Sequence, residues 1–320
     1  MPPKKRVGPS AKAQNSRKKS KGSDGKPIRP PPSPSLSRPS SLSPPPSTID
    51  ETLSGPCTVS QLCEIARMKS CRQAQDALLK QYRLQTRELS EAGLTKRAGH
   101  DPIRQLTIPC TIVDRHETPL LVFIPNLFEG AMLEHINKDS TEASLHADQT
   151  EALTVEKLVE TLEGDWVPEQ LSTFNFRPNS AIVGQALNAA LLKIDELHAL
   201  DVMDIAQRIL EDHPATKELF LHDRTWLNSC IYYFRSGSMN ALLSPPAPLK
   251  AWRFLVVSGE FSGGELYCPQ LMVKLSLQPG HVVAFRGDVE WKVSSSEGFR
   301  AMAMYYTSAA VWDRYDVVCS

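Results

Sequence analysis

Histidine, cysteine and carboxylate side chains are the residues in this sequence that could hold a metal ion. Ten acidic residues lie between positions 134 and 170, with His135 and His146 among them. The two histidines lack the paired helical spacing of a ligand set, so we interpret the segment as a solvated loop followed by a helix from Thr154 to Leu162. The seven cysteines form no C-x-x-C pair. This argues against a zinc site and favours free thiols in a reducing compartment.

The elements that would position a site are clearest between Gly259 and Thr307, where turn signals separate five short strands. Phe261-Ser262-Gly263-Gly264 is a glycine turn, because glycine takes the positive φ angles that such turns need. The segment from Val273 to Leu277 alternates apolar and polar residues, which is the period of a half-buried strand. Val282 to Phe285 is a short apolar strand, and Arg300 to Thr307 is the last strand.

This order of strands and turns resembles the C-terminal half of the Fe(II)/2-oxoglutarate dioxygenases. The matching motifs are G-x-F-x-G-G-E-L at 259–266, Q-P-G-x-V-V-x-F-R at 278–286 and G-x-R at 298–300. The resemblance implies an α+β fold with a double-stranded β-helix (jelly-roll) core and bracing helices. In that family the last arginine holds the distal carboxylate of 2-oxoglutarate, which implies Arg300 as the cofactor-binding residue.

The iron ligands of the family have no counterparts in this alignment. The family has a metal-binding histidine nine residues before the arginine, and Trp291 stands there, whose indole offers no lone pair to a metal. The His-x-Asp pair of the family, aligned on Asn240, falls on Arg235 and Gly237. Arginine is permanently protonated and glycine has no ligand atom, so these three positions are interpreted as vestigial. We expect no catalytic residue, no bound metal and no cofactor.

Shifting the alignment does not restore the two-histidine, one-carboxylate set that such iron sites use. Between Asp223 and Gly280 there is no histidine, and His281 is the only one that follows. The pair His222-Asp223 is adjacent rather than separated by one residue and lies well upstream. We interpret His281 as a turn residue, and Trp291 as an indole that fills a vacated metal pocket.

A hairpin ahead of this core widens the resemblance to residues 105–315. Its strands are predicted at Leu106 to Val113 and Pro119 to Pro125, joined by the turn Asp114-Arg-His-Glu. This hairpin is similar to that of the fungal TET/JBP-like branch, whose members oxidise methylated bases. Helices are predicted at residues 58–90, 186–200 and 202–211 from their apolar periodicity.

The charge is distributed unevenly along the chain. Residues 1–50 contain 11 of the 36 Lys and Arg residues, 2 of the 36 Asp and Glu residues, and 12 of the 25 prolines. The remaining residues therefore hold 25 basic against 34 acidic side chains, which argues against broad phosphate binding by the folded part. The tail has too little apolar surface to offset its ordering entropy, so it is predicted to be disordered.

Two basic clusters in this tail, Lys4-Lys5-Arg6 and Arg17 to Lys21, have the spacing of a bipartite nuclear localisation signal. We therefore expect a nuclear protein that binds an import receptor, with a nucleic-acid or chromatin partner as a further expectation. No apolar run approaches 18 residues, so no membrane association is expected. The predicted organisation is a disordered basic tail at 1–55, a helical segment at 56–100 and the dioxygenase-like jelly roll at 101–320.

Three functions are compatible with these observations. The favoured one is a catalytically inactive dioxygenase-like nuclear protein that acts by binding. The second is an active Fe(II)/2-oxoglutarate dioxygenase that oxidises a nucleobase with an atypical ligand set, in which His281 or an upstream histidine would replace a missing ligand. The third is a scaffolding protein recruited through its basic tail.

Overall fold

The computed structural model describes residues 57–84, 103–146, 178–212, 228–237, 251–287, 289–307 and 309–315. The chain divides into two compact units, residues 1–52 and 53–320, and every described residue belongs to the second. The predicted disordered tail and its localisation signal lie outside the described residues, as does the predicted helix at 154–162. No helix in the described ranges is long and apolar enough to cross a membrane.

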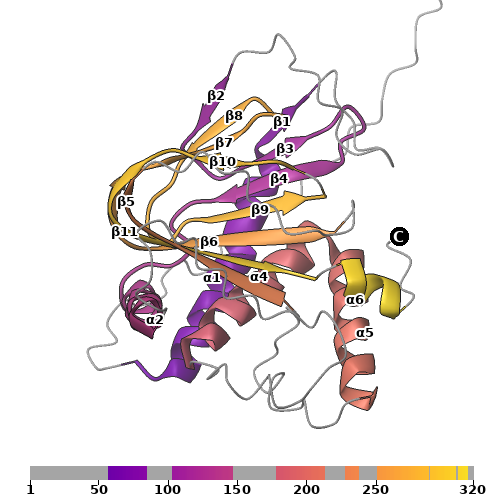
Figure 1. The fold of residues 1–320 in the computed structure, drawn as a ribbon. Helices are drawn as coiled ribbons and strands as arrows, with labels where there is room; N and C mark the ends of the chain where they lie inside the picture. The colour runs from indigo at the N-terminus through magenta and orange to yellow at the C-terminus, as the bar shows by residue number, and fades with distance from the viewer. Residues whose placement is uncertain are drawn as a thin grey trace, which may run out of the picture. The chain divides into compact units, whose positions relative to one another are not determined.

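Two β-sheets form the centre of the second unit (Figure 1). The seven-stranded sheet has the order β1-β3-β4-β9-β6-β11-β5, and the four-stranded sheet has the order β10-β7-β8-β2. The strands are β1 (Gln81–Arg83), β2 (Arg104–Leu106), β3 (Cys110–Val113), β4 (Pro119–Ile124), β5 (Asn228–Gly237), β6 (Trp252–Gly263), β7 (Glu265–Cys268), β8 (Val273–Ser276), β9 (Val282–Arg286), β10 (Lys292–Val293) and β11 (Ser296–Tyr306).

The chain passes repeatedly from one sheet to the other, which is the winding of a jelly roll. It leaves β6 for β7 at Gly263-Gly264, returns at β9, crosses again to β10 and returns at β11. β11 lies between β6 and β5 and is antiparallel to both. The side chains that point between the two sheets form one apolar core, which includes Leu255, Leu266, Phe285 and Met302.

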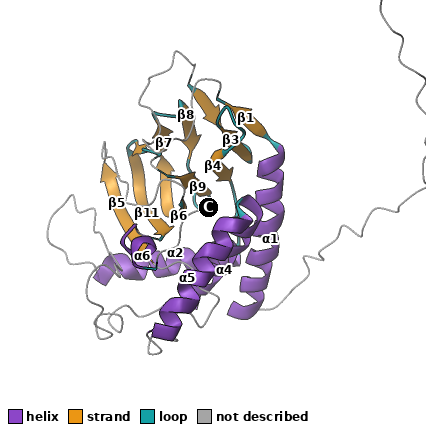
Figure 2. Cartoon of the chain, turned by 90° about the vertical axis from the view of Figure 1, so that its right-hand side faces the viewer, coloured by secondary structure: helices purple, strands orange, loops and turns teal. Residues whose placement is uncertain are grey.

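In the described part of the chain the sheets are accompanied by the helices α1 (Val59–Leu79), α2 (Ala131–His146), α4 (Pro178–Ile194), α5 (Glu196–Asp212) and α6 (Ala309–Arg314). Helices α1 and α4 lie on one side of the strands (Figure 2). A second apolar core joins them to the outer face of the seven-stranded sheet. Helix α1 begins at a capping box in which the Thr58 hydroxyl accepts from the Gln61 amide while the Gln61 side chain accepts from the Thr58 amide.

A polar cluster fixes the junction of α4 and α5 to this outer face. Asp195, between the two helices, accepts a hydrogen bond from Trp252 Nε1 at 3.0 Å and pairs with Arg286 at 3.2 Å. Its second oxygen accepts from the His198 amide at the start of α5. His198 in turn accepts from the Trp252 backbone amide, and burial lowers the pKa of its imidazole to about 4. The imidazole is therefore neutral, as an acceptor must be.

The predicted core strands are confirmed, and four local predictions need correction. The helix predicted to reach residue 90 ends at Leu79, because residues 81–83 form β1 and pair with β3. The first arm of the hairpin is interrupted, since β2 joins the four-stranded sheet and only Cys110–Val113 pairs with β4. The segment after Glu134, predicted as a loop, belongs to α2. The break between the later helices falls at Asp195, where a carboxylate caps α5, and not at residue 201.

Replacing Asp195 by alanine is expected to lower the free energy of unfolding by about 3 kcal/mol, because it leaves the Arg286 charge and the Trp252 N–H unpaired. The matched control is Asp204→Ala, which removes an ion pair with Arg208 that is half exposed and should cost less than about 1 kcal/mol. Urea denaturation of both variants gives the comparison. Equal losses in the two variants would contradict a structural role for the Asp195 cluster.

Candidate functional site

Arg300 is a buried charge between the two sheets. Arg300 lies on the same face of β11 (Ser296–Tyr306) as the core residues Met302 and Met304, because residues two apart in a strand point the same way. Its side chain therefore points into the interior, and the residue is 0 % exposed. Its Nη2 donates to the Ser294 carbonyl at 3.2 Å, and its guanidinium lies 5.5 Å from the centre of the Phe261 ring. Burial lowers the pKa of the guanidinium to about 10, which still leaves it charged at neutral pH.

The guanidinium of Arg300 occupies the place where any other residue at 264 would put its side chain. Gly264 has φ +78°, and a Cβ there would overlap Arg300 Nη1 and lie 3.2 Å from Ser296 Cβ. Both the backbone conformation and the space therefore require glycine at this crossing between the sheets. The Gly-Gly turn predicted from the sequence is thus also part of the wall around Arg300.

Ser296 lies against the same glycine. Its side chain is 5 % exposed, and its Oγ is buried without a hydrogen-bond partner among the described residues. A buried hydroxyl without a partner is unfavourable by about 1–3 kcal/mol. Arg300 and Ser296 therefore place a positive charge and an unused hydroxyl around one point, which is an arrangement suited to an anion with two acceptor oxygens.

Trp291 is also fully buried in the core between the sheets. Its ring stacks on Phe285 with an interplanar angle of 12° and a centroid distance of 6.4 Å. The loop that carries Trp291 is fixed by a buried side chain, since the Arg253 guanidinium donates hydrogen bonds to the carbonyls of Gly287 and Val289. A well-packed indole has therefore taken the interior position at residue 291.

The same loop has a second buried anchor. The Gln270 side chain accepts from the backbone amide of Glu290 at 2.5 Å. Gln270 comes from the β7–β8 connection, whereas Arg253 comes from β6, so both sheets contribute to the placement of Trp291. Neither residue was identified from the sequence, although an arginine within the apolar run Trp252 to Val257 is a signal that could have been noted.

The positions aligned with the His-x-Asp pair lie on β5. Arg235 pairs with Phe299 and Gly237 pairs with Ser296, on either side of a β-bulge. Because neighbouring residues of a strand alternate between faces, position 235 lies on the face opposite to that of Arg300. Residues 238–250, which follow β5, lie outside the described part of the chain. The assignment of positions 235 and 237 as vestigial ligand positions stays a prediction.

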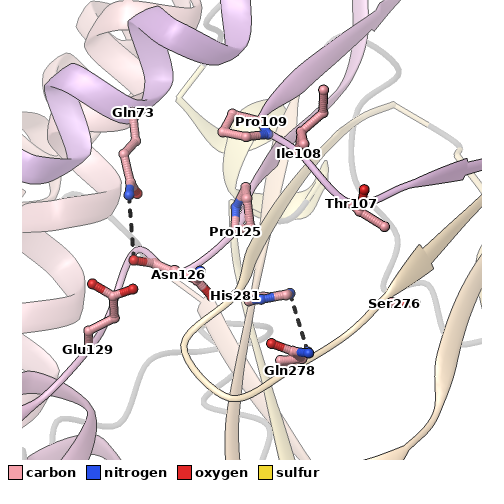
Figure 3. A pocket seen from close by; sticks show the side chains of 10 residues that line it. All are labelled: Gln73, Thr107, Ile108, Pro109, Pro125, Asn126, Glu129, Ser276, Gln278 and His281. Atoms are coloured by element: carbon pink, nitrogen blue, oxygen red, sulfur yellow. Dashed lines mark hydrogen bonds between the residues drawn. The ribbon is translucent and has the colours of Figure 1, made fainter.

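A cleft of about 370 Å³ lies at the turn before β9, and His281 is one of the residues that line it (Figure 3). Its Nδ1 accepts from the Gln278 backbone amide at 3.2 Å, so its Nε2 carries the proton and donates to Asn126 Oδ1 at 3.0 Å. Burial lowers the pKa of the imidazole to about 4, which favours this neutral form. The lone pair that would bind a metal is thus used within the turn. Within the described ranges, no group of three His, Cys, Asp or Glu side chains is arranged to hold a metal ion.

Comparison with known proteins identifies the fold. No protein-family model and no curated protein matches the sequence. NgTET1, solved in complex with 5mC DNA, aligns over 80 % of this chain and 92 % of its own with a TM-score of 0.55 and 11 % identity. The chain shares its fold with a TET protein.

Two further solved structures align less well with this TET-like fold. A prolyl hydroxylase from Trichoplax adhaerens, in complex with a hypoxia inducible factor peptide, aligns over 61 % of this chain and 86 % of its own, with a TM-score of 0.36 and 6 % identity. A prolyl-4-hydroxylase from Pseudomonas putida aligns over 59 % and 92 %, with a TM-score of 0.33 and 8 % identity. The expected mixed α+β fold is therefore supported by the likeness to NgTET1, while membership of the fungal TET/JBP-like branch stays a prediction.

Gly264→Ala is expected to lower the free energy of unfolding by about 3 kcal/mol, since the new methyl group overlaps the Arg300 guanidinium and the backbone is left-handed. The control Gly130→Ala shares the positive φ angle but meets no atom within 4 Å, and should cost about 1 kcal/mol. Thermal and urea unfolding measure both.

A double variant isolates the overlap with the guanidinium. In an Arg300→Met background, Gly264→Ala should cost little more than Gly130→Ala does. If its full cost persists there, the space at Gly264 is not kept for Arg300.

Proposed function

We propose that this chain is a catalytically inactive relative of the Fe(II)/2-oxoglutarate dioxygenases that acts by binding, with Arg300 holding a carboxylate. The observation that carries the proposal is the contrast between two buried interior positions. Trp291, aligned with a metal-binding histidine, is packed against Phe285 as part of the core. Arg300, aligned with the carboxylate anchor, keeps its charge in the interior beside Gly264.

The residues present do not suit the iron ion that the fold family uses. Such a site needs two imidazole nitrogens and a carboxylate oxygen on one face. Indole supplies no lone pair, and the His281 lone pair accepts a backbone hydrogen bond. The residues do suit a carboxylic acid, because a guanidinium in a low-dielectric interior favours an anion strongly. The proposed function therefore keeps the acid-binding half of the ancestral site and omits the oxidation.

Metal loading and turnover test this proposal directly. Purified full-length protein is incubated anaerobically with Fe(II), desalted and analysed for iron, and is then given oxygen and 2-oxoglutarate while succinate is measured. We expect iron well below one equivalent and no succinate above a protein-free control. Stoichiometric iron together with succinate release would overturn the proposal.

That last outcome would favour the second candidate, an active nucleobase oxygenase, which the shared fold with NgTET1 keeps in consideration. In that case His281→Ala should abolish turnover, because His281 would have to leave Gln278 and Asn126 to reach a metal. His222, the other histidine considered for this role, lies outside the described residues. Activity that survives His281→Ala would direct the search to that upstream segment.

We further propose that the basic tail directs the protein to the nucleus through an import receptor. Lys4-Lys5-Arg6 and Arg17 to Lys21 would bind two acidic grooves of that receptor. Changing Arg17-Lys18-Lys19 to alanine should shift a fluorescent fusion toward the cytoplasm, whereas the same change at Lys12, Lys26 and Arg29 should not. A nuclear signal that is unchanged by the first substitution would leave the tail without this role, and localisation would then depend on the folded body.

A further inference from the structure

We infer that the exposed face of α5 is a docking surface for a basic amphipathic helix of another protein. This face consists of Leu197, Leu200 and Met203 with the carboxylates of Glu196 and Asp204 beside them, and we call this set the α5 face. It belongs to a helix outside the two sheets, so the inference does not depend on what the interior between the sheets binds.

Exposed apolar side chains gather at the corner formed by α4 and α5. Four of the eight large apolar side chains that are exposed in the described ranges lie between residues 192 and 203. In α5, Leu197 is 65 % exposed, Leu200 50 % and Met203 47 %. Leu192, in the last turn of α4, is 40 % exposed. Single apolar residues on a surface are ordinary, whereas a cluster of them indicates a contact surface.

Leu200 is the centre of the α5 face. Residues three and four apart are neighbours on the surface of a helix. At a separation of three, the neighbours of Leu200 are the apolar residues Leu197 and Met203. At a separation of four, they are the acidic residues Glu196 and Asp204. A line of apolar side chains therefore crosses a pair of carboxylates at Leu200.

The opposite face of α5 is already packed within the fold. Val202, Ile205 and Ile209 are buried in a cluster with Ala251 and Trp312, and α6 lies beside α5 (Figure 1). The apolar residues of the α5 face take no part in this cluster. A helix with apolar side chains on two faces is expected to have a packing partner on each of them.

The charge of α5 indicates the kind of partner. The helix has one basic residue, Arg208, and five acidic residues: Glu196, Asp201, Asp204, Glu211 and Asp212. Phosphate groups of a nucleic acid or of an anionic membrane would be repelled by this surface. A helix that carries lysine or arginine on both sides of an apolar stripe would match both the leucines and the carboxylates.

A second copy of this chain fits the α5 face poorly. In a two-fold symmetric contact the same patch is used by both copies. With Leu200 on the two-fold axis and the helices antiparallel, Glu196 of one copy would lie near Asp204 of the other. Like charges placed together at an interface are unfavourable, so the charge pattern favours a basic partner over self-association.

A synthetic helix of about 18 residues tests the inference, and it contains only leucine and lysine, with leucines alternately three and four positions apart. Its binding to the full-length protein is measured by fluorescence anisotropy. It should bind, and more weakly as salt is added, because charges at an exposed surface are screened. The same helix with glutamate in place of lysine should not bind. Equal binding by a peptide of the same composition in scrambled order would show attraction by charge alone and would overturn the inference.

Variants of the protein locate the binding surface. Leu200→Ser removes the central apolar contact and should weaken binding roughly tenfold. The matched control, Leu79→Ser, changes a leucine at the end of α1 that is 77 % exposed, and should bind as the parent does. Glu196→Gln combined with Asp204→Asn should weaken binding and reduce its dependence on salt. If Leu200→Ser binds the probe as well as the parent does, the site lies elsewhere and the inference is wrong.

Two measurements without the probe separate a partner protein from the other occupants. Leu200→Ser should melt at the same temperature as the parent, because the side chain is half exposed. A clear loss of stability would show that another part of this chain covers Leu200, and would overturn the inference. Sedimentation should give the same oligomeric state for both proteins. A parent dimer that Leu200→Ser dissociates would identify a second copy as the occupant and would overturn the assignment of a basic partner.

Discussion

The interior of this jelly roll is organised around the charge of one arginine. A guanidinium transferred from water to an apolar core is strongly unfavourable unless hydrogen bonds and a compensating charge surround it. Around Arg300 the chain supplies a carbonyl, an aromatic ring and a glycine that leaves room for Nη1. The crossing from β6 to β7 and the start of β11 meet at this point. The geometry of both sheets at this crossing is thus adapted to a buried charge.

Trp291, in contrast to Arg300, fills its interior position with an apolar side chain. At this position an indole packs against Phe285, and two buried polar side chains, Arg253 and Gln270, hold the backbone of its loop. A large aromatic side chain in such a position adds apolar contact area and excludes water. The interior between the sheets therefore contains a position filled by apolar packing, at Trp291, and a position that carries a charge, at Arg300.

Local patterns predicted the strands, and long-range contacts explain what the sequence did not predict. The glycine turn at 263–264 and the alternation at 273–277 depend on neighbouring residues alone, so they were recognised. Ser296 lies against Gly264, which is more than thirty residues away in the sequence, and only the fold brings the two together. The end of α1 was missed for the same reason, because β1 exists only through its pairing with β3. Periodicity carries no information about a partner strand, and these features all depend on one.

The position of β11 between β5 and β6 has a consequence for how the protein is made. Both of its neighbours, β5 and β6, precede it in the chain. Until residues 296–306 have been synthesised, β5 and β6 each present an unpaired edge that can join another chain. The pairing of β4 with β9, across more than 150 residues, delays closure further. The seven-stranded sheet is therefore complete only after β11 has joined β5 and β6, and the intermediates that precede this step are the form of this protein most exposed to aggregation.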